Sequence, residues 1–410
     1  MSAVTSPYAN PVREATSAAA LTDDERTRIL AKSAQFAPPS AVLPDGRREL
    51  VGLSREELTE ILLEIGEKPF RTKQLWHWIY HQGATDFSSM SSIARPLQEK
   101  LAERFVISRP QAATVQTSSD ETRKFLFRFR DGQEAETVYI PDRREDRGAV
   151  CISSQVGCTL SCTFCHTGTQ GLVRNLGAAE IVGQFMAARD SYGEWPSPRG
   201  ETPRLLSTIV LMGMGEPLYN YENIAKAMKI IMDGEGIGLS RRRITLSTSG
   251  VIPMMDQCGD ELGINLAISL HAVRDDLRDE LVPLNRKYPI ADLIAACRRY
   301  PAASNARRIT FEYIMLRGVN DSEADARELV RLIAGIPAKV NLIPFNPWPG
   351  SRFQPSTREQ LDRFANIVME AGFASPIRMP RGRDILAACG QLRTESQRAR
   401  RQPAATTGNA

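Results

Sequence analysis

The chain has 410 residues, 42% of them hydrophobic and 24% charged, which is enough for one large globular domain and a smaller one. Its net charge of +4 permits a nucleic-acid partner without requiring one. Seven cysteines, odd in number and mostly clustered, argue against a disulfide framework, and no run approaches the ~18 apolar residues of a membrane span. We therefore expect a cytoplasmic protein that is neither exported nor anchored.

The N-terminal part of the chain divides into two regions. Residues 1–48 mix Ala, Ser, Thr and Pro with charges of both signs, which predicts a disordered extension. From Ser54 the sequence SREELTEILLEIG has a Ser cap, a Glu three residues later and apolar residues at helical spacing, and it ends on Gly66. Further helical stretches over 68–80 and 91–105 predict a small helical, RNA-binding domain over 49–110, in which the aromatic residues are interpreted mainly as core.

A hairpin is predicted next. Residues 124–130 alternate apolar and basic side chains at the period of a half-buried strand. Asp131 and Gly132 are predicted to form a turn, and residues 136–140 the second strand of the hairpin. We assign residues 111–145 to a hairpin linker between the helical domain and the C-terminal part of the chain.

Strands and helices then alternate. Apolar, β-branched runs occur at 149–153, 206–213, 243–248, 264–270, 308–316 and 339–345, and helical patterns at 178–189, 221–233, 251–257, 289–299 and 322–335. This βα repeat predicts an α/β fold with a parallel sheet and right-handed crossovers. Six units, with a further short strand near 376–380, favour an open, TIM-like partial (β/α)6 barrel over 146–392, followed by a basic disordered tail over 393–410.

The first strand runs into the sequence Cys158-Thr-Leu-Ser-Cys162-Thr-Phe-Cys165. Thiolates suit zinc, copper(I) or iron–sulfur clusters, and this spacing lets one loop surround a single centre. No second pair of ligands follows, and His166 lies too close in sequence to reach the same ion easily. The pattern favours a four-iron cluster with one open iron, as in radical S-adenosylmethionine enzymes; a zinc knuckle is the alternative.

Distinctive polar residues also follow the other strands. Gly213–Pro217, Ser247–Gly250, Ser269–His271 and Asn346–Gly350 each come directly after a predicted strand. Because the carboxyl ends of parallel strands share one edge, these segments are expected to meet there. Each alone is typical of a turn or helix cap, but together they predict a functional site.

Seven motifs resemble one family. They are AETVYIP, CISSQVGCTLSCTFC, LMGMGEP, RRRITLSTSG, LAISLHA, NLIPFNPWPG and RGRDILAACGQL, in this order. From about Leu50 to Gln391 the sequence closely resembles the RlmN family of radical S-adenosylmethionine RNA adenine methyltransferases. The departures are peripheral: a longer N-terminus, His166-Thr-Gly after the cysteines, and an Arg-rich tail.

The resemblance implies roles for particular residues. Cys158, Cys162 and Cys165 match the cluster ligands. S-adenosylmethionine is held at positions that match Gly215, Glu216, Ser247, Ser269, Leu270, His271 and Asn346. Cys389 matches a cysteine that is methylated during turnover, Cys151 the second essential cysteine and Glu136 the proton acceptor. For Cys151, thiol exchange predicts an accessible, thiolate-prone side chain. Cys258 and Cys297 lie in helical patterns and are interpreted as core.

The resemblance also implies an activity and its partners. Carbon 2 of adenine carries no acidic proton, so direct polar methyl transfer fails there, and the family uses a methylated cysteine and a radical instead. One 4Fe-4S cluster per chain, two S-adenosylmethionine molecules per turnover and an electron donor such as flavodoxin or ferredoxin are implied, in a monomeric enzyme. The substrates implied are adenosine 2503 of 23S rRNA and adenosine 37 of tRNA.

Basic residues are the candidate phosphate contacts, although any one of them alone is more typical of a solvated surface. The candidates are Arg71, Lys73, Lys124, Arg128, Arg130, Arg241, Arg242, Arg243, Arg393, Arg398, Arg400 and Arg401. Three other functions remain open: a Cfr-type enzyme that methylates carbon 8, a radical enzyme acting on a small molecule, and a non-enzymatic iron–sulfur or zinc protein that binds RNA.

Overall fold

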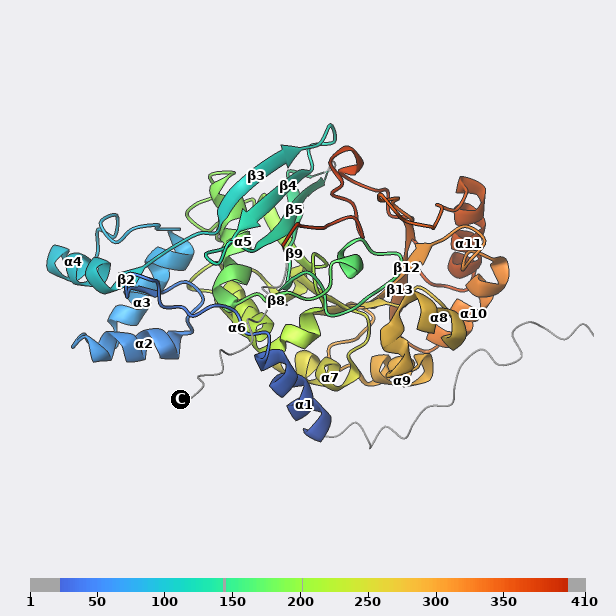
Figure 1. Cartoon of the computed structure of the whole chain (residues 1–410), viewed down its shortest axis with the longest axis horizontal. Coiled ribbons are helices and arrows are strands. Elements are labelled where there is room, and N and C mark those ends of the chain that lie inside the picture. The colour runs from blue at the N-terminus through green and yellow to red at the C-terminus, as the bar shows by residue number, and fades with distance from the viewer. Residues whose placement is uncertain (1–22, 143–144, 201, 397–410) are drawn as a thin grey trace, which may run out of the picture.

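A nine-stranded sheet organises the computed structural model, which describes residues 23–142, 145–200 and 202–396 (Figure 1). Its strands run in the order β13-β12-β11-β10-β9-β6-β5-β4-β3. Their bounds are β3 Gln111–Thr117, β4 Arg123–Arg128, β5 Glu134–Asp142, β6 Arg147–Cys151, β9 Leu206–Leu211, β10 Ile244–Thr248, β11 Asn265–Ser269, β12 Ile309–Met315 and β13 Ala338–Pro344. From β6 to β13 all pairings are parallel, which confirms the predicted six-stranded partial barrel.

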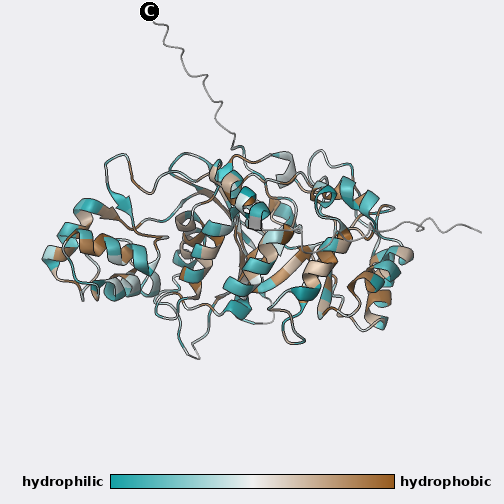
Figure 2. Ribbon diagram, turned by 90° about the horizontal axis from the view of Figure 1, so that it is seen from below, coloured by the Kyte–Doolittle hydropathy of each residue, from teal (hydrophilic) through white to brown (hydrophobic). Residues whose placement is uncertain are grey.

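Helices connect the parallel strands and cover the outside of the sheet (Figure 1). They are α5 Ala178–Asp190, α6 Tyr221–Met232, α7 Ile252–Glu261, α9 Ile290–Arg299, α10 Glu323–Ile333 and α11 Arg358–Glu370, with the short α8 Asp275–Leu281 after β11. Within α10, Ala326, Leu329 and Ile333 are buried at helical spacing, and Figure 2 shows such hydrophobic positions in brown beside teal hydrophilic ones. The sequence pattern missed α8 and α11.

The predicted seventh strand is reduced to a few bridging residues. Ala374 and Ile377 pair in parallel with β13 at Lys339 and Leu342, and the Arg378 N–H donates to the Leu342 carbonyl over 2.8 Å. This pairing places residues 374–378 along the open edge of the barrel.

The hairpin is part of the barrel sheet rather than a linker. Gly132 occupies the turn between β4 and β5, as predicted, and β5 also pairs antiparallel with β6, so that Val138 lies opposite Cys151. Residues 135–139 of β5 are all buried because the sheet continues on both sides of the strand. The predicted hairpin is confirmed, and its separation from the barrel is not.

The N-terminal helical unit packs against the α6 end of the barrel. It contains α2 Arg55–Glu64, α3 Arg71–Trp76 with a π turn over His77–His81, and α4 Arg95–Arg104, beside the short strands β1 Arg48–Glu49 and β2 Phe105–Val106. The predicted Ser54 capping box is present. Trp76 is buried, as expected for core, and its Nε1 donates to Asp233, which also accepts two 2.8 Å hydrogen bonds from Arg55.

Part of the predicted N-terminal disorder is wrong. Residues Asp23–Ala34 form helix α1, whose Ile29 is buried, and α1 packs on α7 with a 2.7 Å hydrogen bond from Arg26 to the Pro253 carbonyl. Its sequence, DDERTRILAKSA, has little apolar character, so the local pattern did not predict a helix that packs on the barrel. Residues 1–22 of the extension and 397–410 of the tail lie outside the described residues. Thr394, which falls within the predicted disordered tail, is buried and therefore ordered with the barrel. No helix of the described chain is both long enough and apolar enough to cross a membrane.

Candidate active site

The segments that follow the parallel strands meet at the C-terminal edge of the sheet. The turn after β9 is tied to the segment after β6 because the Met214 N–H donates to Ser153 Oγ over 2.8 Å and the Glu216 N–H to Gln155 Oε1 over 3.0 Å. Gly215 has a φ of +100°, and a Cβ there would lie 2.5 Å from the Gln155 side chain. Only glycine therefore fits this turn without displacing the neighbouring loop.

The cysteine loop follows β6 and is closed by two short strands, β7 Gln155–Val156 and β8 Arg174–Asn175. Gly157 allows the loop to close, since a Cβ there would lie 1.8 Å from the Gly171 carbonyl oxygen. The three cysteines, Cys158, Cys162 and Cys165, are partly buried on this loop. Desolvation raises the pKa of each thiol, to about 12 for Cys162, and the neighbouring cysteines add to the rise for Cys158 and Cys162.

This donor set fits a cluster with three protein ligands. A positively charged centre would reverse the rise in pKa, because a coordinating thiol is deprotonated. No three His, Cys, Asp or Glu side chains of the described chain converge on the position of a single ion. A four-iron cluster needs no such point of convergence, because each cysteine binds a different iron, and with three cysteines the fourth iron is left open.

Glu216 lies beside the cysteine loop with a buried carboxylate. It accepts hydrogen bonds from the Ser249 N–H at 2.9 Å and the Leu218 N–H at 3.1 Å. Desolvation raises its pKa to about 7, and these hydrogen bonds oppose the rise. A buried carboxylate at this pKa is suited to a cationic or hydrogen-bond-donating ligand, such as an ammonium group.

Ser247 and Ser269 extend the same region across β10 and β11, where their hydroxyl oxygens lie 3.5 Å apart and are half-buried. Leu270 is fully buried behind them. His271 has a φ of +61°, and its Nδ1 accepts a hydrogen bond from the Ile314 N–H at 3.1 Å. Burial lowers the pKa of His271 to about 3, so the imidazole is neutral.

Asn346, which follows β13, connects this region to Cys389. Its Nδ2 donates to the Cys389 carbonyl over 3.2 Å, and its buried Oδ1 has no hydrogen-bond partner among the described residues. A buried amide oxygen without a partner is costly, and it fits a donor from a bound ligand. The Asn346 oxygen and the Glu216 carboxylate both follow parallel strands at the C-terminal edge of the sheet, and each fits a ligand such as S-adenosylmethionine, which offers both donors and charge.

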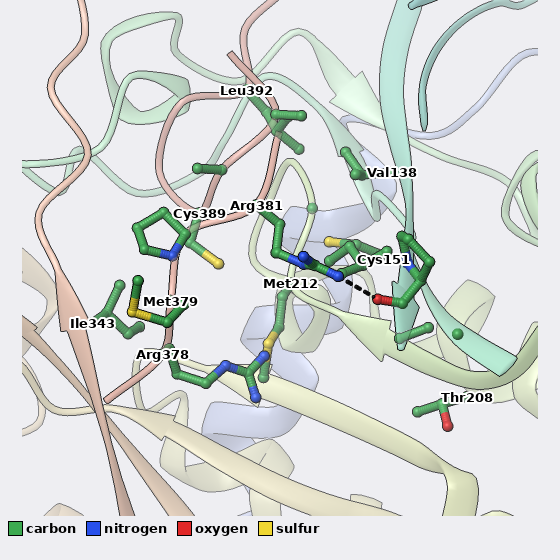
Figure 3. A pocket seen from close by; sticks show the side chains of 18 of the residues that line it. Val138, Cys151, Thr208, Met212, Ile343, Arg378, Met379, Arg381, Cys389 and Leu392 are labelled. Atoms are coloured by element: carbon green, nitrogen blue, oxygen red, sulfur yellow. Dashed lines mark hydrogen bonds between the residues drawn. The ribbon is translucent and has the colours of Figure 1, made fainter. Parts of the chain in front are cut away.

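Cys151 and Cys389 lie on opposite walls of a cavity of about 650 Å³, with both sulfur atoms directed inward (Figure 3). Both are free thiols, and Cys165 and Asn346 line the same cavity. Cys389 is exposed to the cavity, yet desolvation raises the pKa of its thiol, and the nearby Arg378 guanidinium opposes this rise. Cys151 is largely buried from bulk solvent but lines the cavity, and desolvation raises the pKa of its thiol, so the expectation of an accessible side chain holds only toward the cavity and the free thiol is not thiolate-prone.

Glu136 does not line this cavity. Its carboxylate forms a 2.8 Å ion pair with Lys124 and accepts the Arg393 N–H at 2.9 Å. Burial raises the pKa of Glu136, and Lys124 opposes the rise. Lys124, a candidate phosphate contact in the sequence, is therefore engaged inside the protein.

Comparison with known proteins supports the assignment of this region as a site for an iron–sulfur cluster and S-adenosylmethionine. The family model "Ribosomal RNA large subunit methyltransferase N-terminal domain" matches residues 48–107, and "Radical SAM superfamily" matches residues 200–330. The "Dual-specificity RNA methyltransferase RlmN" of Gluconobacter oxydans is 81% identical over 98% of this chain and 98% of its own. The relative with the same name in Granulibacter bethesdensis is 80% identical, over 92% of this chain and 96% of its own.

The chain belongs to the RlmN family. It is therefore a radical S-adenosylmethionine RNA methyltransferase, a class that uses an iron–sulfur cluster and S-adenosylmethionine. Among solved structures, a radical SAM methyltransferase from Sphaerobacter thermophilus superposes with a TM-score of 0.77 at 45% identity, over 84% of this chain and 99% of that one. This agreement confirms the fold expected from the sequence.

In this RlmN-family chain, residues after the cluster loop hold the segment that carries Cys389. The His166 N–H donates to the Gly390 carbonyl over 2.8 Å, and Thr167 Oγ1 donates to the Leu392 carbonyl over 2.5 Å. The Trp348 ring stacks on His166 with centroids 4.8 Å apart. His166 and Thr167 belong to the segment that the sequence analysis described as a peripheral departure from the family. In the structure they connect the cluster loop to the segment that carries Cys389.

Thr167→Val should loosen this connection. A hydrogen bond of this kind contributes about 1 kcal/mol, so we expect Cys389 to be alkylated by iodoacetamide about fivefold faster. Thr169→Val is the matched control, because the Thr169 hydroxyl bonds to the His166 carbonyl within the same turn. Peptide mass spectrometry of Cys389, with the buried Cys258 as internal reference, measures the rate; equal rates in both variants would assign Thr167 no such role.

Sequence reasoning missed Arg278 on α8 of this methyltransferase. Its fully buried guanidinium donates to the carbonyl oxygens of Ser249, Ser269 and Leu270, and so ties the ends of β10 and β11 together. The sequence around it, DDLRDEL, is typical of an exposed helix, and no local pattern distinguishes it from one.

Proposed function

We propose that this enzyme methylates carbon 2 of adenosine in RNA through a methylated Cys389, acting on adenosine 2503 of 23S rRNA and on adenosine 37 of tRNA. The observation that carries the proposal is the pair of free thiols, Cys151 and Cys389, that face each other across one cavity beside Cys165. Two thiols in that arrangement can first hold and then release a one-carbon unit.

Cofactor binding is assigned to two sets of residues. Cys158, Cys162 and Cys165 hold one 4Fe-4S cluster per chain. S-adenosylmethionine is held by Gly215, Glu216, Ser247, Ser269, Leu270, His271 and Asn346. When bound, the cluster and two S-adenosylmethionine molecules per turnover supply the methyl group and the radical that activates it.

The chain's own residues then act on the RNA. The Cys389 sulfur carries the one-carbon unit and joins it to carbon 2, which ties the RNA covalently to the protein. Glu136 accepts the proton from carbon 2; a raised pKa makes its carboxylate a stronger base, and the Arg393 N–H must first move away from it. Cys151 attacks the Cys389 sulfur, the bond between this sulfur and the one-carbon unit breaks, and the released carbon takes up a proton to become the methyl group, leaving a disulfide for reduction.

Burial has a consequence for this last step. Since desolvation keeps Cys151 protonated near neutral pH, its proton must leave as the sulfur attacks. The two cysteines lie close enough for their charges to interact, and this proximity supports the proposed attack of Cys151 on the Cys389 sulfur. An electron donor such as flavodoxin or ferredoxin and a monomeric state complete the proposal.

Nucleoside mass spectrometry tests the proposed position of the methyl group. RNA from cells that lack the gene should lose 2-methyladenosine from both 23S rRNA and tRNA, and the gene should restore it. Loss of 8-methyladenosine instead would assign the chain to the Cfr type of chemistry. Loss from rRNA alone would overturn the proposed tRNA substrate while leaving carbon 2 in place.

A further inference from the structure

Four arginines line the cavity that contains Cys151 and Cys389, and they differ in what they contact. Arg381 donates to the Pro141 carbonyl over 2.8 Å and lies 3.7 Å from Asp120, while Arg147 forms an ion pair with Glu145. The guanidiniums of Arg378 and Arg243 have no hydrogen bond or ion pair within the described part of the chain. Two cations of this cavity are thus engaged by the protein, and two are available to a ligand.

Arg378 is the available cation that lies among the reacting groups. Its backbone is held by β13, and its side chain extends into the cavity toward Met212, on the side of Cys389 (Figure 3). It interacts electrostatically with Cys151, Cys389 and the buried Glu312 carboxylate, without a hydrogen bond or ion pair to any of them among the described residues. Arg243, in contrast, precedes β10 and so lies near the opposite edge of the sheet from the cysteine loop.

An exposed apolar side chain lies next to this cation. Met379 is 68% exposed and lines the cavity together with Ile343 and Pro380. A large apolar side chain left open at a cavity offers a surface on which an unstacked base can pack. Methionine suits this use because its flexible, polarizable thioether adapts to a flat ring.

We propose that Arg378 binds an RNA phosphate beside the target adenosine and that Met379 packs against the unstacked base. The inference rests on the proposed function, because an enzyme that reacts at carbon 2 must first take the base out of its stack. A guanidinium binds a phosphate through two parallel N–H donors, and such contacts fix the register of the RNA without reading its sequence. The pair therefore positions the nucleotide between the two thiols.

The test compares three variants on a synthetic RNA stem-loop with one unpaired adenosine. Arg378→Ala should weaken binding about tenfold at low salt and lower the slope of log K against log salt by about 0.7 to 0.9. Met379→Ala should weaken binding without changing this slope, since no charge is lost. Arg381→Ala, which removes a cation already engaged by Pro141 and Asp120, is the matched control and should keep the wild-type slope.

A second measurement separates substrate binding from an effect on the thiols. Methylation of Cys389 by S-adenosylmethionine is followed by protein mass spectrometry without RNA. Because Arg378 also opposes the rise in the Cys389 thiol pKa, Arg378→Ala should slow this methylation modestly, and it should in addition raise the KM for RNA. Slower Cys389 methylation with unchanged KM and salt slope would assign Arg378 to thiol ionisation and overturn the inference. If wild-type Cys389 never becomes methylated, the proposed function fails. The comparison of RNA affinity and its salt dependence among the variants still tests whether Arg378 binds a phosphate.

Discussion

Cys389→Ala is expected to abolish methyl transfer to RNA while keeping the cluster and S-adenosylmethionine binding. The reason is chemical: this variant lacks the thiol that we propose accepts the methyl group. The two other cysteines that line the cavity are Cys151, assigned to product release, and Cys165, a candidate cluster ligand. We expect methylated nucleoside to fall below detection in a single-turnover assay, with iron content unchanged. The measurement is nucleoside mass spectrometry after anaerobic reaction.

Cys151→Ala is expected to behave differently from Cys389→Ala. The variant can still join RNA to Cys389, but it has no second thiol to release the product, so a covalent protein–RNA adduct should accumulate. Denaturing gel electrophoresis after one turnover detects the adduct, and nuclease digestion is the control. Cys151 pairs with Val138 and Val210 in the sheet, so Cys151→Ser tests whether any loss comes from packing.

The contrast between these two variants decides the mechanism. A structural role predicts that both variants lose fold or cluster together. Free methylated RNA at normal yield from Cys151→Ala, or carbon 2 methylation by Cys389→Ala, would show that the two-cysteine mechanism does not apply.

Changing Cys158, Cys162 and Cys165 together to Ala should reduce the iron content to near nothing. These three thiols are the candidate ligands on one loop, and the wild-type protein should be brown and oxygen-sensitive. Iron and zinc analysis after anaerobic reconstitution measures the effect. Cys258→Ala is the control, because this buried cysteine lies on α7, away from the loop, and should leave the iron unchanged. One zinc and no iron in the wild-type protein would contradict the assignment.

The sequence determined the local elements and the order of the site segments. The repeat of apolar runs predicted the six parallel strands, the Ser54 cap predicted the start of α2, and the spacing of three cysteines predicted a cluster loop. These features depend on residues that are neighbours in the chain, so periodicity and spacing suffice to predict them. The C-terminal edge rule then predicted that the polar segments would meet.

Only the tertiary structure decided which distant groups share a surface. It orders α1 through contacts with α7, extends the barrel sheet with β5, and covers Glu136 with Lys124 and the Arg393 backbone. It also separates Arg381, which is bound to Pro141, from the available Arg378 three residues earlier. Local patterns carry no information on such partners, because burial and pairing depend on segments that are far apart in the chain and meet only in the folded protein.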